Sequence, residues 1–112
     1  MPVQWFPGHM HKGIGQIREN IGKSDIVLEI LDARIPWSSR NPMIEKIVEN
    51  KPLLIVLNKS DLADSSVLKL WEEYFKKNRS NSDVVQVSAI TGKNISGIVE
   101  KSRYLCREYE WI

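Results

Sequence analysis

The chain has 112 residues, 42% of them hydrophobic, and a formal net charge of +2 from 16 basic and 14 acidic side chains. We expect one small domain spanning residues 1–112 with a single modest core. The charge is too small to indicate nucleic-acid binding by itself. The lone Cys106 excludes an internal disulfide. Because no stretch approaches 18 apolar residues and no signal-peptide core is present, we expect a cytosolic protein without membrane contact.

Helical and strand patterns alternate along the chain. The predicted helices cover residues 10–21, 42–49, 65–77 and a last segment from about residue 96, with a loop at 37–39. The predicted strands cover residues 25–31, 53–57 and 84–87. The apolar residues expected to face inward are Val67, Leu68, Trp71 and Phe75 on the third helix, and Ile98, Val99, Leu105 and Trp111 on the last. This alternation predicts a three-layer α/β fold, in which helices flank a parallel sheet.

The motif Asn58-Lys59-Ser60-Asp61 directly follows the apolar run 53–57. In an N-K-x-D loop the Asp carboxylate can accept two hydrogen bonds from guanine, at the ring N–H and the exocyclic amine, and adenine offers no such pair. Each bond to a charged acceptor is worth roughly 1.5–3 kcal/mol. Asn58 would brace the loop and offer an amide to the base, while the Lys59 stem lies along the ring. The alternative is a plain strand-to-helix turn, which Asn, Ser and Asp also suit.

A second motif, Ser88-Ala89, follows the third predicted strand and precedes the last helix. In G proteins a Ser-Ala at this position places backbone N–H groups against the guanine carbonyl oxygen. Ligands of open α/β sheets bind beyond the carboxyl ends of the strands. Both motifs are therefore expected to face one pocket.

A phosphate-binding loop is absent from the 112 residues, which contain neither G-x-x-x-x-G-K-[ST] nor D-x-x-G. Gly22-Lys23-Ser24 imitates the end of such a loop, but Ile17 replaces its first glycine and the triplet precedes a strand. A glycine-rich loop is what lets several backbone N–H groups converge on phosphate. We therefore expect neither tight GTP binding nor hydrolysis by these residues alone.

Three further segments carry a family resemblance: Q-W-F-P-G-H-M at residues 4–10, L-D-A-R-I-P at 31–36 and S-R-N-P at 39–42. Together with N-K-x-D and Ser-Ala in that order, they resemble the circularly permuted GTPases of the ribosome biogenesis GTPase A type. The resemblance implies a partial P-loop NTPase (Ras-like) G domain, in which the guanine-recognition motifs precede the phosphate-binding ones. It identifies the chain with the N-terminal, guanine-recognition half, to be followed by a strand and a P-loop.

The same resemblance implies a function. It implies a GTPase that acts in large ribosomal subunit assembly, with the large-subunit precursor and ribosomal RNA as partners. The nucleotide is GTP, with Mg²⁺ only in a chain containing the P-loop. His9 is the candidate catalytic residue, because it would orient the attacking water.

Several residues keep a second interpretation. His9 and His11 more simply form a solvated pair, so no metal site is expected. Trp5 and Phe6 could stack on RNA or pack onto the core. Asp32 and Arg34 could be catalytic, although an Asp at a strand end is usually a cap or loop brace. The alternative functions are a non-enzymatic α/β module that docks to RNA or the ribosome, and a structural domain in which N-K-S-D is only a turn.

The first predicted strand begins at Asp25 and ends at Leu31, and its residues 26–31 are all apolar except for Glu29. Such runs are typical of parallel strands buried on both faces. In the Ras-like order that the resemblance implies, this strand lies between the N-K-x-D strand and the P-loop strand. The P-loop strand is not among these 112 residues, so we expect an unpaired hydrophobic edge here, which pairs with another copy of the chain, swaps an element or leads to aggregation.

Overall fold

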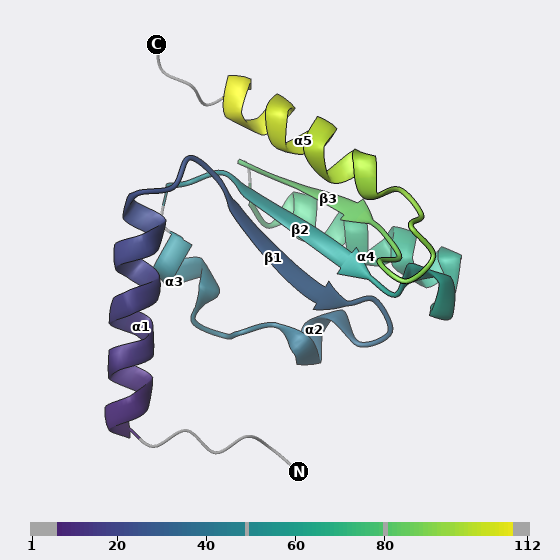
Figure 1. Ribbon diagram of the computed structural model, residues 1–112. Helices are drawn as coiled ribbons and strands as arrows, with labels where there is room; N and C mark the ends of the chain where they lie inside the picture. Colours follow the sequence, from purple (N-terminus) through teal and green to yellow (C-terminus); the bar gives the residue numbers. More distant parts are fainter. Residues whose placement is uncertain (1–6, 49, 80, 109–112) are drawn as a thin grey trace.

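The computed structural model describes residues 7–48, 50–79 and 81–108. Its sheet consists of β1 (Val27–Asp32), β2 (Leu53–Asn58) and β3 (Ser82–Gln86), all parallel and in the spatial order β1-β2-β3 (Figure 1). Helices flank this sheet, so the predicted α/β class is confirmed.

The helices follow the predicted order with one addition. They are α1 (Pro7–Gly22), α2 (Pro36–Ser39), α3 (Ile44–Val48), α4 (Ser65–Lys77) and α5 (Ile95–Glu108), and a 3₁₀ turn, η1, covers Ser60–Leu62. The short helix α2 replaces the loop expected at residues 37–39, because Pro36 suits a first helical position. The next helix begins later than Pro42, since the side chain of Asn41 accepts a hydrogen bond from the Met43 amide and holds a turn there.

Two apolar clusters lie on opposite faces of β2. On one face Leu53, Ile55 and Leu57 pack with Leu68 and Phe75 of α4. On the other face the cluster consists of Leu54, Val56, Val85, Val87 and Leu105, the last from α5. All five apolar residues of β2 are buried. The central strand therefore shows the two-sided burial that a continuous apolar run predicts.

The first strand is less buried than expected. Leu31 is buried, but Leu28 and Ile30 are 44% and 67% exposed. In register they pair with Leu54 and Val56, which lie on the α5 face. Because α5 packs against β2 and β3, it leaves this side of β1 open. The expectation of burial on both faces is thus wrong for β1, whereas the expected free edge is present, since β2 is its only neighbouring strand among the described residues.

Two inward assignments on the helices are also wrong. Val67 of α4 and Val99 of α5 are about half exposed, at 48% and 51%. The helix α4 presents two apolar stripes, and only the one with Leu68 and Phe75 faces the sheet. The other stripe and a residue of α2 line an open apolar groove of about 590 Å³, made of Trp37, Val67, Leu70, Trp71 and Tyr74. No helix in the described part of the chain is long and apolar enough to span a membrane.

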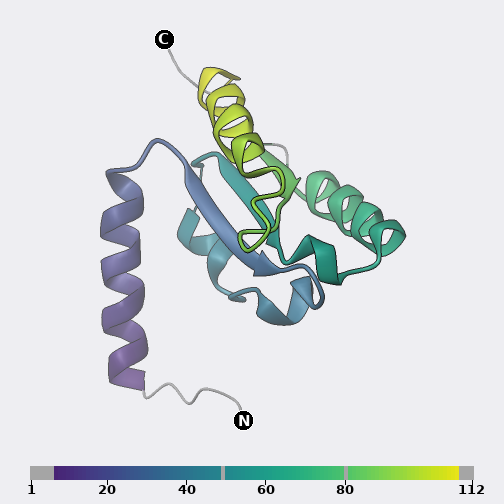
Figure 2. The same cartoon turned by 45° about the vertical axis from the view of Figure 1, so that its right-hand side comes forward.

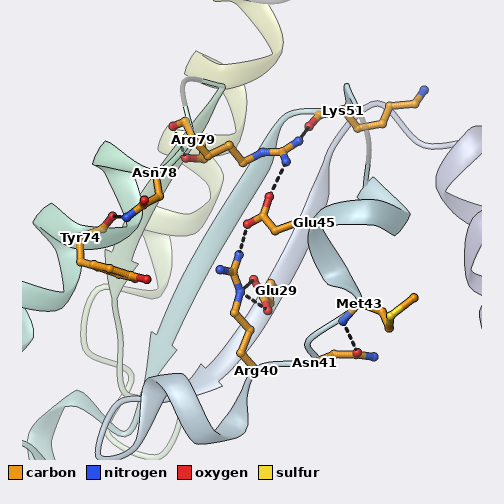
Figure 3. Close-up of polar contacts among 10 residues, drawn as sticks. Glu29, Arg40, Asn41, Met43, Glu45, Lys51, Tyr74, Asn78 and Arg79 are labelled. Atoms are coloured by element: carbon orange, nitrogen blue, oxygen red, sulfur yellow. Dashed lines mark hydrogen bonds and ion pairs between the residues drawn. The ribbon is translucent and has the colours of Figure 1, made fainter.

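A partly buried ionic network accounts for the charge in the middle of β1 (Figure 3). The Nε of Arg40 donates to both carboxylate oxygens of Glu29, at 3.0 and 3.1 Å, and its Nη2 donates to Glu45 at 2.8 Å. Glu45 also accepts from Arg79, whose Nη2 donates to the Lys51 carbonyl oxygen, at 2.9 Å in each case. Burial raises the pKa of Glu29, and the hydrogen bond from Arg40 opposes this shift. The network thus joins β1, α3 and the end of α4.

Replacing Arg40 by Met tests the network. The Glu29 and Arg40 side chains are only 7% and 12% exposed, so the change leaves a buried carboxylate without its partner. We expect the free energy of unfolding, measured by urea denaturation, to fall by about 3–5 kcal/mol. Adding Glu29→Leu should restore most of it, because the uncompensated charge is then gone. Lys23→Ala, which removes an exposed pair with Glu19, should change little. Unchanged stability of Arg40→Met would contradict the account.

Candidate functional site

The loops that follow the three strands gather at one end of the sheet (Figure 2). Asp32, the last residue of β1, is in register with Asn58, the last residue of β2. The amide of Ala33 donates to the Asn58 carbonyl oxygen at 2.7 Å, which ties the first loop to the second. The sheet register therefore brings the two predicted motifs and the segment after β1 to a common edge.

Asn58 joins the two motifs directly. Its Oδ1 accepts a hydrogen bond from the Ala89 amide at 3.0 Å, across 31 positions of the chain. Beside it, the Ser60 amide donates to the Val87 carbonyl oxygen at 3.0 Å. The Nδ2 of Asn58 has no protein partner among the described residues, so it remains available as a donor. Asn58 thus braces the loop with one side-chain atom, while the other has no partner in the part of the chain that the structure describes.

The loop after β2 presents the Asp61 side chain to solvent. Lys59 adopts a left-handed conformation with φ 63°, and the chain then turns through η1, where Ser60 is buried and Asp61 is exposed. Within the described ranges the Asp61 carboxylate has no hydrogen bond or ion pair. Both of its oxygens can therefore accept hydrogen bonds from a ligand.

The helix α4 fixes the far end of this loop. The carboxylate of Asp64 caps its first turn by accepting from the amide of Ser66 at 2.8 Å and of Val67 at 3.4 Å. The hydrogen bond from the Ser66 side chain, followed by the two amide bonds, lowers the pKa of Asp64. Asp61 and Asp64 are three residues apart, yet of the two only Asp64 has a hydrogen-bond partner among residues 7–48, 50–79 and 81–108.

The Ser88-Ala89 segment is more self-contained than expected. Ser88 is buried, its amide donates to the Lys93 carbonyl oxygen at 3.1 Å, and its Oγ accepts from the Thr91 amide at 3.3 Å. Gly92, with φ 77°, makes the tight return possible. Because the Ala89 amide already donates to Asn58, a base carbonyl oxygen at this point would have to share that N–H in a three-centre bond.

Asp32 and Arg34, which the sequence marks as either catalytic residues or a loop brace, form a cluster beside the lysine of the motif. Asp32 accepts two bonds from the Arg34 guanidinium, at 3.0 and 2.7 Å, and one from the Arg34 amide at 2.9 Å. The Lys59 ammonium lies 3.5 Å from the same carboxylate. The Arg34 bonds hold the pKa of Asp32 well below its ordinary value. Asp32 therefore acts as a brace of its loop, and no pattern in the sequence predicts its pair with Lys59.

The donor and acceptor set fits the base of a guanine nucleotide. Asp61 offers two acceptor oxygens and Asn58 offers an amide donor, which matches the polar edge of guanine. Among the described residues no three His, Cys, Asp or Glu side chains cluster in the manner of metal ligands. The side chain of His9 lies outside the described residues, so its role in orienting water stays a prediction.

Comparison with known proteins confirms the resemblance seen in the sequence. The chain is homologous to part of a group of ribosome-associated GTPases. Over 108 residues it is 45% identical to "Ribosome biogenesis GTPase A" of Bacillus licheniformis, covering 96% of this chain and 38% of that protein. It is also 41% identical over 106 residues to "Mitochondrial ribosome-associated GTPase 1" of Mus musculus, covering 94% of this chain and 32% of the relative. The chain thus spans about a third of the length of these relatives. No family model matches it.

The link between the two motifs predicts a hydrogen-exchange effect. Asn58→Ala removes the acceptor of the Ala89 amide, and a neutral hydrogen bond contributes about 1 kcal/mol, so this amide should exchange roughly fivefold faster. Asn58→Asp keeps an acceptor oxygen at the same position and should preserve the protection. Equal exchange of the Ala89 amide in wild type and Asn58→Ala, measured by NMR, would show that the bond does not hold the loops together.

Proposed function

We propose that residues 1–112 form a domain that supplies the guanine-recognition part of a GTPase acting in large ribosomal subunit assembly. The observation that carries this proposal is the exposed, unpartnered carboxylate of Asp61 beside Asn58, whose side chain is tied to the Ala89 amide. The names of the relatives, which are GTPases of ribosome biogenesis or associated with mitochondrial ribosomes, support the wider role. The large-subunit precursor and ribosomal RNA are the proposed partners.

Selectivity in this site comes from unsatisfied hydrogen bonds. Guanine can donate from its ring N–H and its exocyclic amine to the two oxygens of Asp61. Adenine has no matching donor pair. Its binding would remove water from the charged Asp61 carboxylate, and the hydrogen bonds lost to that water would not be replaced. Asn58 Nδ2 can donate to an acceptor on the base, and the Lys59 stem can cover its ring. Each of these groups binds or orients the base, and none of them touches the phosphates.

Hydrolysis is proposed only for a chain that also contains a P-loop, arranged in the circularly permuted order with the guanine motifs first. The 112 residues contain no G-x-x-x-x-G-K-[ST] segment, which is what cradles the phosphates of GTP in P-loop proteins. Mg²⁺ belongs to that phosphate site. The residues described here therefore contribute base selectivity, with weak affinity when the phosphate contacts are missing.

A substitution that reverses the hydrogen-bond pattern tests the assignment. Asp61→Asn replaces one acceptor oxygen by a donor, so xanthine, which carries a carbonyl oxygen in place of the guanine amine, should become the preferred base. By NMR titration, the ratio of GMP to XMP affinity should fall roughly tenfold or more, the equivalent of about one charged hydrogen bond. Asp64→Asn is the matched control, because Asn also caps helices well and Asp64 bonds to Ser66. An unchanged ratio in Asp61→Asn would refute the role of Asp61.

We also propose that the free edge of β1 pairs with a second copy of the chain. The edge has unpaired backbone groups on one side, and the exposed Leu28 and Ile30 add an apolar face next to it. Natural proteins normally cover, charge or shorten such an edge, because it is a template for further strands.

Light scattering over a concentration series tests this pairing. We expect the mean mass of the wild type to rise with concentration and Ile30→Lys to suppress the rise. Leu70→Lys is a matched control, since Leu70 is 65% exposed compared with 67% for Ile30 and lies on α4, across the sheet. A wild type that stays monomeric throughout, with slow hydrogen exchange along residues 27–32, would mean that the chain protects its own edge.

A further inference from the structure

Lys59 pairs with the carboxylate of Asp32 and precedes the carboxylate of Asp61 by two residues in the sequence. Its ammonium is 3.5 Å from Asp32 Oδ2, although Asp61 is only two residues further along the same loop. Asp61 has no partner in the part of the chain that the structure describes. The Lys59 side chain is 42% exposed and thus not confined by packing alone. If the Lys59 ammonium pairs with Asp32, the Asp61 carboxylate remains available to a ligand, whereas pairing with Asp61 would occupy it.

Asp32 is built as a rigid anchor. Its two oxygens accept three hydrogen bonds from Arg34, and its amide donates to the Oγ of Ser39 at 3.1 Å. The adjoining Ala33 amide is bonded to the Asn58 carbonyl oxygen, one residue before Lys59. Asp32 and the start of the N-K-S-D loop therefore move as one unit. Its side chain is 19% exposed, so the attraction to the ammonium is less screened than at the open surface.

Removal of this anchor would free a mobile cation next to the recognition carboxylate. A lysine ammonium is a compact charge with three donors on a flexible four-carbon stem, so it pairs with whichever carboxylate is within reach. A lysine bound to Asp61 would occupy the oxygens that the guanine donors need. The edge of a base displaces water from a carboxylate more easily than it displaces a counter-ion that is covalently part of the same loop.

We propose that Asp32 is a positioning residue of the guanine site, which holds the Lys59 ammonium away from Asp61 and so keeps the recognition carboxylate available. The inference rests on the proposed function, in that guanine is the ligand for which Asp61 is kept free. It assigns the D-A-R segment after β1 to base recognition through Lys59, without contact between Asp32 and the base.

Four proteins test the proposal by NMR titration with GMP: wild type, Asp32→Ala, Lys59→Met and the double variant. Asp32→Ala should weaken GMP binding about two- to fivefold, the range expected for one partly exposed ion pair. In the Lys59→Met background the same change should have no effect, because no ammonium remains to block Asp61. Asp83→Ala is the matched control: Asp83 also pairs with two lysines, Lys76 and Lys101, but lies near the opposite end of the sheet. It should leave GMP affinity unchanged.

The ε-methylene signals of Lys59 give a second readout that does not depend on GMP. In the wild type they should not respond to Asp61→Ala, whereas in Asp32→Ala they should shift on the same change, because the lysine then pairs with Asp61. A loss of GMP affinity that persists in the double variant, or Lys59 signals in Asp32→Ala that ignore Asp61→Ala, would overturn the proposal.

Two further outcomes remain decisive. If no protein in the series binds GMP, the guanine assignment fails, and the Lys59 signals alone decide whether Asp32 keeps the lysine from Asp61. If Asp32→Ala does not fold, Asp32→Asn replaces it with the same expectations, since Asn retains an acceptor for Arg34 and removes the charge.

Discussion

The two-sided burial of β2 is the constraint on which the rest of the structure depends. Five consecutive apolar side chains, Leu53 to Leu57, must be removed from water, and each contributes roughly 1.5–3 kcal/mol when fully buried. A single layer of helices could cover only every second residue. The chain therefore places α4 on one face and α5 on the other. The polar N-K-S-D segment that follows therefore lies at the end of a strand whose two faces are covered by α4 and α5.

The site is the consequence of that placement. Asn58 ends β2 and reaches across to the Ala89 amide, while Asp32 ends β1 at the same level of the sheet. Strand register alone thus brings three loops together. The carboxylates there differ in their partners. Asp32 pairs with Arg34 and Lys59, Asp64 caps α4, and Asp61 has no partner among the described residues.

Much of the fold could be predicted from local patterns. The residues 65–77 match α4 at both ends, because Asp64 is a strong cap and the apolar spacing is helical throughout. The parallel sheet followed from the alternation of elements. Burial was harder to predict, since it depends on which elements are present to cover a strand: Ile30 is exposed because α5 packs elsewhere. Likewise, the helical period of 3.6 residues shows that Val67 lies on an apolar stripe of α4. It does not show that α4 has two such stripes, of which only the other faces the sheet.

The motif positions of the site could be read from the sequence, but their hydrogen bonds could not. N-K-S-D and Ser-Ala mark two loops, and spacing places both at carboxyl ends of strands. The use of the Ala89 amide by Asn58, and of Asp32 by Lys59, depends on side-chain orientation across loops that are distant in sequence. Glu29 shows the same limit, because its partner Arg40 lies 11 residues away.

The central role proposed for the Asp61 carboxylate is recognition of the guanine base. A crystal structure of the 112-residue protein grown with GMP tests it most directly. We expect the ring N–H and the exocyclic amine of the base to lie within hydrogen-bond distance of the two Asp61 oxygens, with the Lys59 ammonium still paired with Asp32. A base bound elsewhere, or one whose donors face another group while Asp61 remains in water, would contradict it.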